Sequence, residues 1–191
     1  MMYKLTLKRN RQRKTNYRKR TALLLSRRNF IVAKISDQNI SGQILKPTIK
    51  GDITICSAHS KELRKYGWKG SMNSLPACYL TGFLLGKKSI ANSTDNAILY
   101  TGVDSFTSRI AACLKGVIAA GVSVPVSEDI LPADDRISGK HIAEYAKILK
   151  ADDAKYRSRF STIIKDGLNP EEYPSHVDAT KGKISENFPS K

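Results

Sequence analysis

The first 28 residues hold the side chains with the clearest chemistry in this chain of 191 residues. They contain eleven Lys and Arg residues and no Asp or Glu, with Tyr3 and Tyr17 interleaved among them. Arginine guanidinium groups bind phosphate oxygens in pairs, and both arginine and tyrosine stack on bases. We therefore predict that this basic arm binds nucleic acid. Its cations are Lys4, Lys8, Arg9, Arg11, Arg13, Lys14, Arg18, Lys19, Arg20, Arg27 and Arg28.

The charge of the whole chain is unevenly distributed. It carries 33 basic and 17 acidic residues, a formal net charge of +16. Residues 29–120 hold eleven basic and five acidic side chains, and residues 121–191 hold eleven and twelve. A run of uncompensated positive charge repels itself, so a polyanion must neutralise it before it becomes compact. The alternative, a solvated tail that only aids solubility, fits this concentration of charge less well.

A catalytic interpretation of the histidines is weaker. His59 follows a predicted strand and lies near Ser57, Ser60 and Cys56, so a paired nucleophile and base is conceivable. No G-x-S-x-G turn and no paired carboxylates accompany it, and we predict that the protein is not an enzyme. No histidine or cysteine cluster has metal-ligand spacing, so we expect no metal and no cofactor. Cys56, Cys78 and Cys113 are widely spaced in apolar surroundings and are expected to be buried free thiols.

The elements that position these residues follow from periodicity. Thr15 is expected to cap a short helix that runs to Arg28, and residues 1–14 are expected to order only on a partner. Alternating apolar residues predict an antiparallel meander of three strands, with turns at 36–39 and 50–52. The strands are expected at 29–36, 39–46 (ended by Pro47) and 53–60.

The rest of the chain reads as alternating helix and strand. Gly82 and Gly86 are spaced for close helix packing. Together these elements predict an α/β fold, a three-layer-type sandwich with a mixed sheet and a C-terminal helical extension. We expect helices at 74–90, 108–120, 140–149 and 151–166, a short strand at 97–100, and a loop or tail around the prolines after 170. The expected units are the arm and its helix (1–28), the α/β core (29–122) and the extension and tail (123–191).

Six segments stand out in one order over about residues 9–165: Lys14–Arg20, Ser57–Leu63, Tyr66–Gly70, Pro76–Gly82, Arg109–Gly116 and Leu131–Ile142. Together they resemble a single ribosomal family. The sequence is similar to the archaeal and eukaryotic form of large-subunit ribosomal protein eighteen, counterpart of eukaryotic large-subunit protein five, which binds 5S rRNA. Any one of these segments alone is weak evidence for the family, but the whole set in this order is specific to it.

The resemblance implies a structural constituent of the large subunit in the cytoplasm. Its expected partners are 5S rRNA, the large rRNA of the central protuberance and neighbouring proteins, including the other 5S rRNA-binding protein. No membrane and no small-molecule substrate is expected. Trp68 is equally well explained as a core aromatic residue. The candidate RNA-binding residues are Arg9, Arg11, Arg13, Lys14, Thr15, Tyr17, Arg18, Lys19, Arg20, Arg27, Ser57, His59, Ser60, Trp68 and Lys69.

Two features of the chain depart from the family pattern. The loop 104–107 is shorter than usual, and the segment after Lys165 matches archaeal length rather than eukaryotic length.

Two other functions are alternatives to the ribosomal one. A free-standing RNA-binding or RNA-processing protein would use the same scaffold away from the ribosome. A membrane-anchored protein would need more apolar anchors than Tyr3, Leu5 and Leu7.

Overall fold

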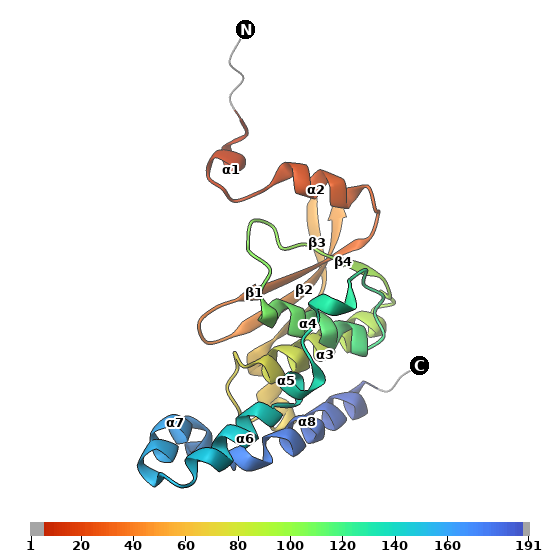
Figure 1. Cartoon of the computed structure of the whole chain (residues 1–191). Helices are drawn as coiled ribbons and strands as arrows, with labels where there is room; N and C mark the ends of the chain where they lie inside the picture. The colour runs from red at the N-terminus through yellow and green to blue at the C-terminus, as the bar shows by residue number, and fades with distance from the viewer. Residues whose placement is uncertain (1–5, 189–191) are drawn as a thin grey trace.

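The structure, a computed structural model, describes residues 6–188, and the expectations for Tyr3, Lys4 and Leu5 lie outside them. Its centre is a four-stranded sheet in the order β3-β2-β1-β4 (Figure 1). Strands β1 (Asn29–Ile35), β2 (Ile40–Thr48) and β3 (Gly51–His59) form the predicted antiparallel meander. The short strand β4 (Ala97–Leu99) pairs in parallel with β1, which makes the sheet mixed as expected.

Pro47 does not end β2, contrary to the sequence prediction. It pairs with Asp52 of β3, and the strand continues to Thr48. On the other side of β2 the pairing with β1 stops at Phe30 and Leu45, so no neighbouring carbonyl is present for the missing amide of Pro47. A proline is tolerated at a strand position that has a paired neighbour on one side only.

One face of the sheet is covered by α3 (Leu75–Ala91) and α4 (Ser108–Ala119). The helices begin at Ser74 and Thr107, whose side chains accept hydrogen bonds from the first-turn amides. They cross so closely that a Cβ added to Gly82 would overlap the carbonyl of Cys113, and one added to Gly116 would overlap the carbonyl of Tyr79. This confirms the packing role predicted for Gly82. The core between helices and sheet includes Ile31, Ile44, Leu80, Leu84 and Leu114.

The expectation of a loop or tail after residue 170 is wrong. The chain forms 3-10 helix η3 (Pro170–Glu172) and then α8 (Tyr173–Asn187). Both prolines lie in first turns, where a missing amide costs no hydrogen bond. Tyr173, Val177 and Ile184 of α8 are buried in the same core cluster as Trp68 and Leu80. The extension is therefore packed onto the core of the α/β unit.

Of the remaining elements, the helices of residues 140–149 and 153–165 lie at the end of the molecule opposite the arm (Figure 1). The expected helices at 140–149 and 151–166 are present as α6 and α7, separated by a turn at 150–152. The predicted helical turn after β3 is the 3-10 helix η1 (Ser60–Tyr66). The bounds of the others are η2 (Glu128–Ile130), α5 (Asp134–Ser138), α6 (Lys140–Leu149) and α7 (Asp153–Lys165). No helix within residues 6–188 is long and apolar enough to cross a bilayer.

All three cysteines are buried free thiols, as predicted. Burial raises the pKa of Cys56 to about 11 and the pKa values of Cys78 and Cys113 to about 12. With these pKa values, roughly one thiol in a thousand or fewer is ionised at pH 8, and the thiolate is the reactive form.

We expect the native thiols to resist iodoacetamide at that pH, whereas an added exposed thiol, Ser105→Cys, is alkylated within minutes. Mass spectrometry before and after denaturation measures both, and native alkylation of Cys113 would contradict the packing.

Candidate nucleic-acid interface

The basic arm is partly ordered by its own local contacts. Residues Lys8–Arg11 form a helical turn, α1, so the expectation that 1–14 stays unordered without a partner is wrong for this part. The second helix, α2, spans Tyr17–Leu24 and is shorter than the predicted helix ending at Arg28. Its cap is Asn16, whose side chain accepts from the amide of Lys19, and not Thr15. Thr15 is buried and its hydroxyl accepts a 2.9 Å hydrogen bond from Nε of Arg9.

Arg20 holds α2 against the sheet. Its guanidinium makes two hydrogen bonds, of 2.5 and 2.9 Å, with the carboxylate of Asp52 in β3. The same group lies 5.7 Å from the ring centres of Phe30 and Tyr100, a cation–π geometry. Hydrogen bonding to Asp52 raises the pKa of Arg20 further, so its charge is fixed. Arg20 therefore positions the arm, and its guanidinium is already occupied.

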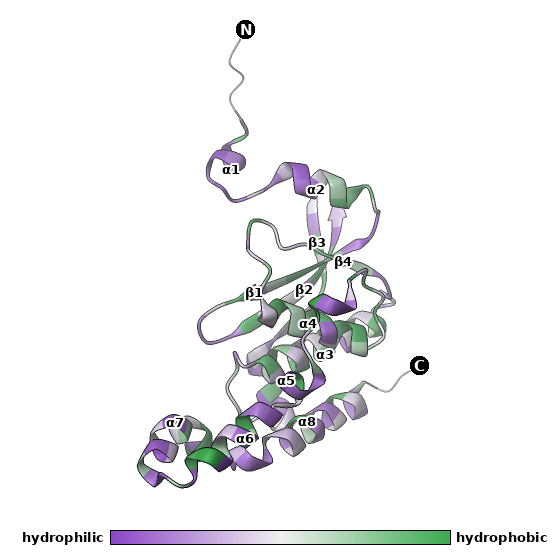
Figure 2. Cartoon of the chain, viewed as in Figure 1, coloured by the Kyte–Doolittle hydropathy of each residue, from purple (hydrophilic) through white to green (hydrophobic). Residues whose placement is uncertain are grey.

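Four other arm cations are available to a ligand. Arg11, Arg13, Lys14 and Arg18 are exposed, and the structure gives their side chains no ion pair or hydrogen bond within residues 6–188. Arg13 has a left-handed backbone (φ 53°), which turns the chain between α1 and α2. Figure 2 shows α1 and the first part of α2 as hydrophilic, and no residue of either helix is buried. These cations remain in water until a polyanion neutralises them.

Three parts of the chain surround one hollow of about 760 Å³ beside the arm. The arm forms one wall, the outer face of the sheet forms the floor, and the segment after β4 forms the other wall. Lys19 joins two of these parts, because its ammonium donates a 2.7 Å hydrogen bond to the hydroxyl of Thr101. The arm, sheet and loop residues that line the hollow include Arg9, Arg13, Lys14, Thr15, Tyr17, Arg20, Lys34, Gln43, Asp52, Tyr100, Thr101 and Asp104.

The outer face of the sheet, away from α3 and α4, carries rows of polar side chains next to Val32 and Leu45. Gln43 of β2 lies opposite Ser57 of β3, and in the next row Lys34, Ser41 and His59 are paired across three strands. Side chains alternate between faces along a strand, so these residues lie on the same side as the hollow. Amide, hydroxyl, imidazole and ammonium groups arranged in rows can hydrogen-bond to sugar hydroxyls and phosphates.

The candidates from the sequence did not include Lys34, Gln43 or Thr101. The alternation that predicted the strands contained the signal for the first two, because a polar residue between inward-facing apolar residues must face outward. Nothing in the sequence indicates that Thr101, which follows a different strand, meets the arm.

The candidates near η1 have different positions. Ser60 is fully buried, where its hydroxyl accepts from the amide of Ile40 and bonds to Asn39. His59 caps η1, with Nδ1 accepting from the amide of Lys61. Cys56 faces the core, on the opposite side of β3 from His59, so the two side chains do not pair. Within residues 6–188 no group of three His, Cys, Asp or Glu residues could hold a metal ion.

Trp68 is a core residue in this structure, which corrects its place among the surface candidates. Its side chain is only 2% exposed, stacks on His176 and meets Tyr173 edge-on. Its indole N–H donates to the carbonyl of Ser71. The adjacent Lys69 is exposed, and its amide donates to Nε2 of His176. The physical cause of the difference is α8, whose burial on the core covers the indole.

The Arg20–Asp52 contact gives a prediction about the arm. No residue of α2 is fully buried, so the helix depends on few contacts. We expect Asp52→Asn to speed amide hydrogen exchange in Tyr17–Leu24 about fivefold, because a partly exposed ion pair contributes up to about 1 kcal/mol. Glu171→Gln, which removes the distant pair with Lys150, is the matched control and should leave α2 exchange unchanged. Equal exchange in both variants would show that Arg20 does not anchor the arm.

Two comparisons with known proteins bear on this surface. Residues 1–109 match the profile of a family described as "Ribosomal large subunit proteins 60S L5, and 50S L18". The large ribosomal subunit protein uL18 of Thermofilum pendens is 44% identical over 187 residues. That alignment covers 96% of this chain and 95% of the relative.

Proposed function

The chain belongs to the uL18 family of large-subunit ribosomal proteins, and from this premise we propose that it binds 5S rRNA through the arm and the outer face of the sheet. Its role is structural: it is a constituent of the large ribosomal subunit. The finer assignment, also proposed here, is that it attaches 5S rRNA to the large rRNA in the central protuberance, beside neighbouring ribosomal proteins.

The observation that carries the proposal is the convergence of unpaired cations and polar strand residues on one hollow. Structured RNA is recognised mainly through its phosphates, its 2′-hydroxyls and its shape. The arm supplies cations for phosphates, and β1, β2 and β3 supply hydrogen-bonding groups at a spacing set by the sheet. A surface of this kind needs no catalytic group, and we propose that the protein is not an enzyme.

The proposed contacts fall into two groups. Exposed arm cations would neutralise phosphates, while Tyr17, Ser57 and His59 would contact sugars or bases. Thr15 and Arg20 position the arm, and Ser60 and Trp68 support the segment that presents Lys69. The proposed phosphate contacts are Arg9, Arg11, Arg13, Lys14, Arg18, Lys19, Arg27 and Lys69.

Two measurements test this function. Purified chain should retain 5S rRNA in a filter-binding assay with a micromolar or tighter dissociation constant at moderate salt. In a sucrose gradient of cell extract, the chain should migrate with the large subunit. A chain found mainly free of ribosomes would instead favour an independent RNA-binding protein. Failure to retain 5S rRNA, with co-migration intact, would leave the ribosomal role and remove the proposed RNA partner.

A further inference from the structure

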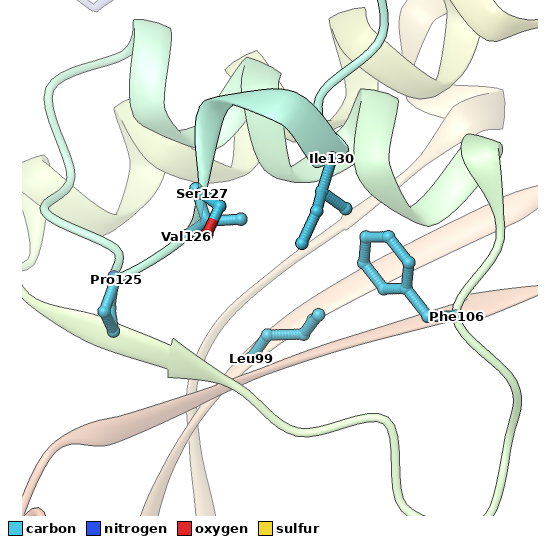
Figure 3. A pocket seen from close by; sticks show the side chains of 6 residues that line it. All are labelled: Leu99, Phe106, Pro125, Val126, Ser127 and Ile130. Carbon is cyan, nitrogen blue, oxygen red and sulfur yellow. The ribbon is translucent and has the colours of Figure 1, made fainter.

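A second hollow lies on the other side of β4 from the arm and has a different chemistry. It has a volume of about 540 Å³ and shares no lining residue with the hollow beside the arm. Figure 3 shows its side chains pointing toward a common space from β4, the loop before α4 and the segment around η2. They are Leu99, Phe106, Pro125, Val126, Ser127 and Ile130.

The walls of this hollow expose apolar side chains that the fold leaves without a partner. Phe106 is 42% exposed and Ile130 is 51% exposed. The floor of the hollow is held in place, because Leu99 and Val126 pack against the hydrophobic core. An exposed apolar surface with a preformed floor is a typical protein-interaction site.

A small polar metabolite fits this hollow poorly. Ser127 is the one lining residue with a polar side chain. Sites for small ligands combine an apolar surface with several convergent polar groups that fix orientation, and the lining lacks them. The hollow instead has room for one bulky apolar side chain delivered by a larger partner.

The charges beside the hollow indicate the kind of partner. Glu128 and Asp129 stand in the same short helix as Ile130, are exposed, and have no ion pair within residues 6–188. Of the two cations of α4, Lys115 is already engaged by Asp134 and by the carbonyl of Pro132, and Arg109 is exposed in the first turn. Two uncompensated carboxylates repel RNA phosphates and attract Lys and Arg. The rim therefore favours a basic protein segment over rRNA, even though Phe106 alone could stack on a base.

We propose that this surface is the docking site for a Lys- or Arg-rich segment of another large-subunit protein. The segment inserts one apolar side chain between Phe106 and Ile130 and places its cations beside Glu128 and Asp129. The inference goes beyond the proposed 5S rRNA contact, which uses a different hollow.

Site-specific photocrosslinking in assembled ribosomes tests the proposal. p-Benzoyl-phenylalanine replaces Phe106 in one chain and Ile130 in a second, each chain is incorporated into large subunits in cells, and the purified subunits are irradiated. The expected product, from at least one position, is a crosslink to a protein segment that has Lys or Arg within a few residues of the attachment point. Crosslinks to rRNA, to a second copy of this chain or to nothing from both positions would overturn the proposal.

A charge-reversal variant tests the role of Glu128 and Asp129 in the docking. Glu128→Lys combined with Asp129→Lys should lower the crosslink yield about fivefold or more, because each exposed pair contributes modestly. The matched control, Glu144→Lys with Glu186→Lys, makes the same charge change on exposed residues elsewhere and should leave the yield unchanged. An equal fall in both variants would mean that net charge, and not this rim, sets the yield. Filter binding of 5S rRNA by each chain is a separate readout, so loss of that contact is distinguished from loss of docking.

Discussion

Replacing Arg13, Lys14 and Arg18 with Glu is expected to weaken 5S rRNA binding about a hundredfold or more while leaving the fold intact. All three side chains are exposed and have no ion pair within residues 6–188, so no internal contact is lost. Each reversal removes a phosphate contact and adds repulsion. Filter binding at fixed salt measures the loss, and circular dichroism checks the fold. Arg20 is left unchanged, because Arg20→Glu would place a carboxylate against Asp52 and displace α2.

The salt dependence of binding separates this explanation from a general charge effect. A chain that neutralises six or more phosphates should lose about a thousandfold in affinity between 50 and 200 mM salt. The triple variant should show a slope of log affinity against log salt that is smaller by about two to three. The matched control reverses Lys147, Arg159 and Lys165, which are equally exposed but lie on α6 and α7. Similar losses in both variants would contradict a specific role for the arm.

Gly82→Ala is expected to destabilise the protein by about 3 kcal/mol or more. The added methyl group would overlap the carbonyl of Cys113 in α4, and the three nearest atoms all belong to backbone. Backbone cannot swing aside as a flexible side chain does, so α3 and α4 must separate along their whole contact. Since both helices also cover the sheet, the cost spreads into the core. Urea unfolding followed by circular dichroism measures the free energy.

Gly182→Ala is the control, because the same chemical change should have the opposite sign. Gly182 lies within α8, is exposed, and has no atom within 4 Å of the position that a Cβ would occupy. Alanine favours the helix over glycine by up to about 1 kcal/mol. We expect Gly182→Ala to be neutral or stabilising. If both variants change stability by less than about 1 kcal/mol, the close crossing of α3 and α4 is not as tight as the structure gives it.

Much of the core fold could be predicted because it rests on local patterns. The three meander strands, their two turns and the helices after Ser74 and Thr107 follow from side-chain alternation and from capping residues. The errors came where tertiary contacts override such patterns. The segment that begins at Pro170 contains three prolines and was expected to be a loop or tail, yet Tyr173 and Ile184 are buried against the core, and residues 173–187 form a helix.

The candidate interface, too, could be predicted from the sequence only in part. The excess of charge in residues 1–28 is a property of composition, and the sequence alone determined that this end of the chain would meet a polyanion. Only the tertiary structure decided which cations are available to it. Arg18 and Arg20 are two residues apart and look equivalent, but Asp52 is brought beside Arg20 by the turn between β2 and β3. A contact partner that is distant in sequence leaves no local signal. The different roles of Arg18 and Arg20 are therefore visible only in the folded chain.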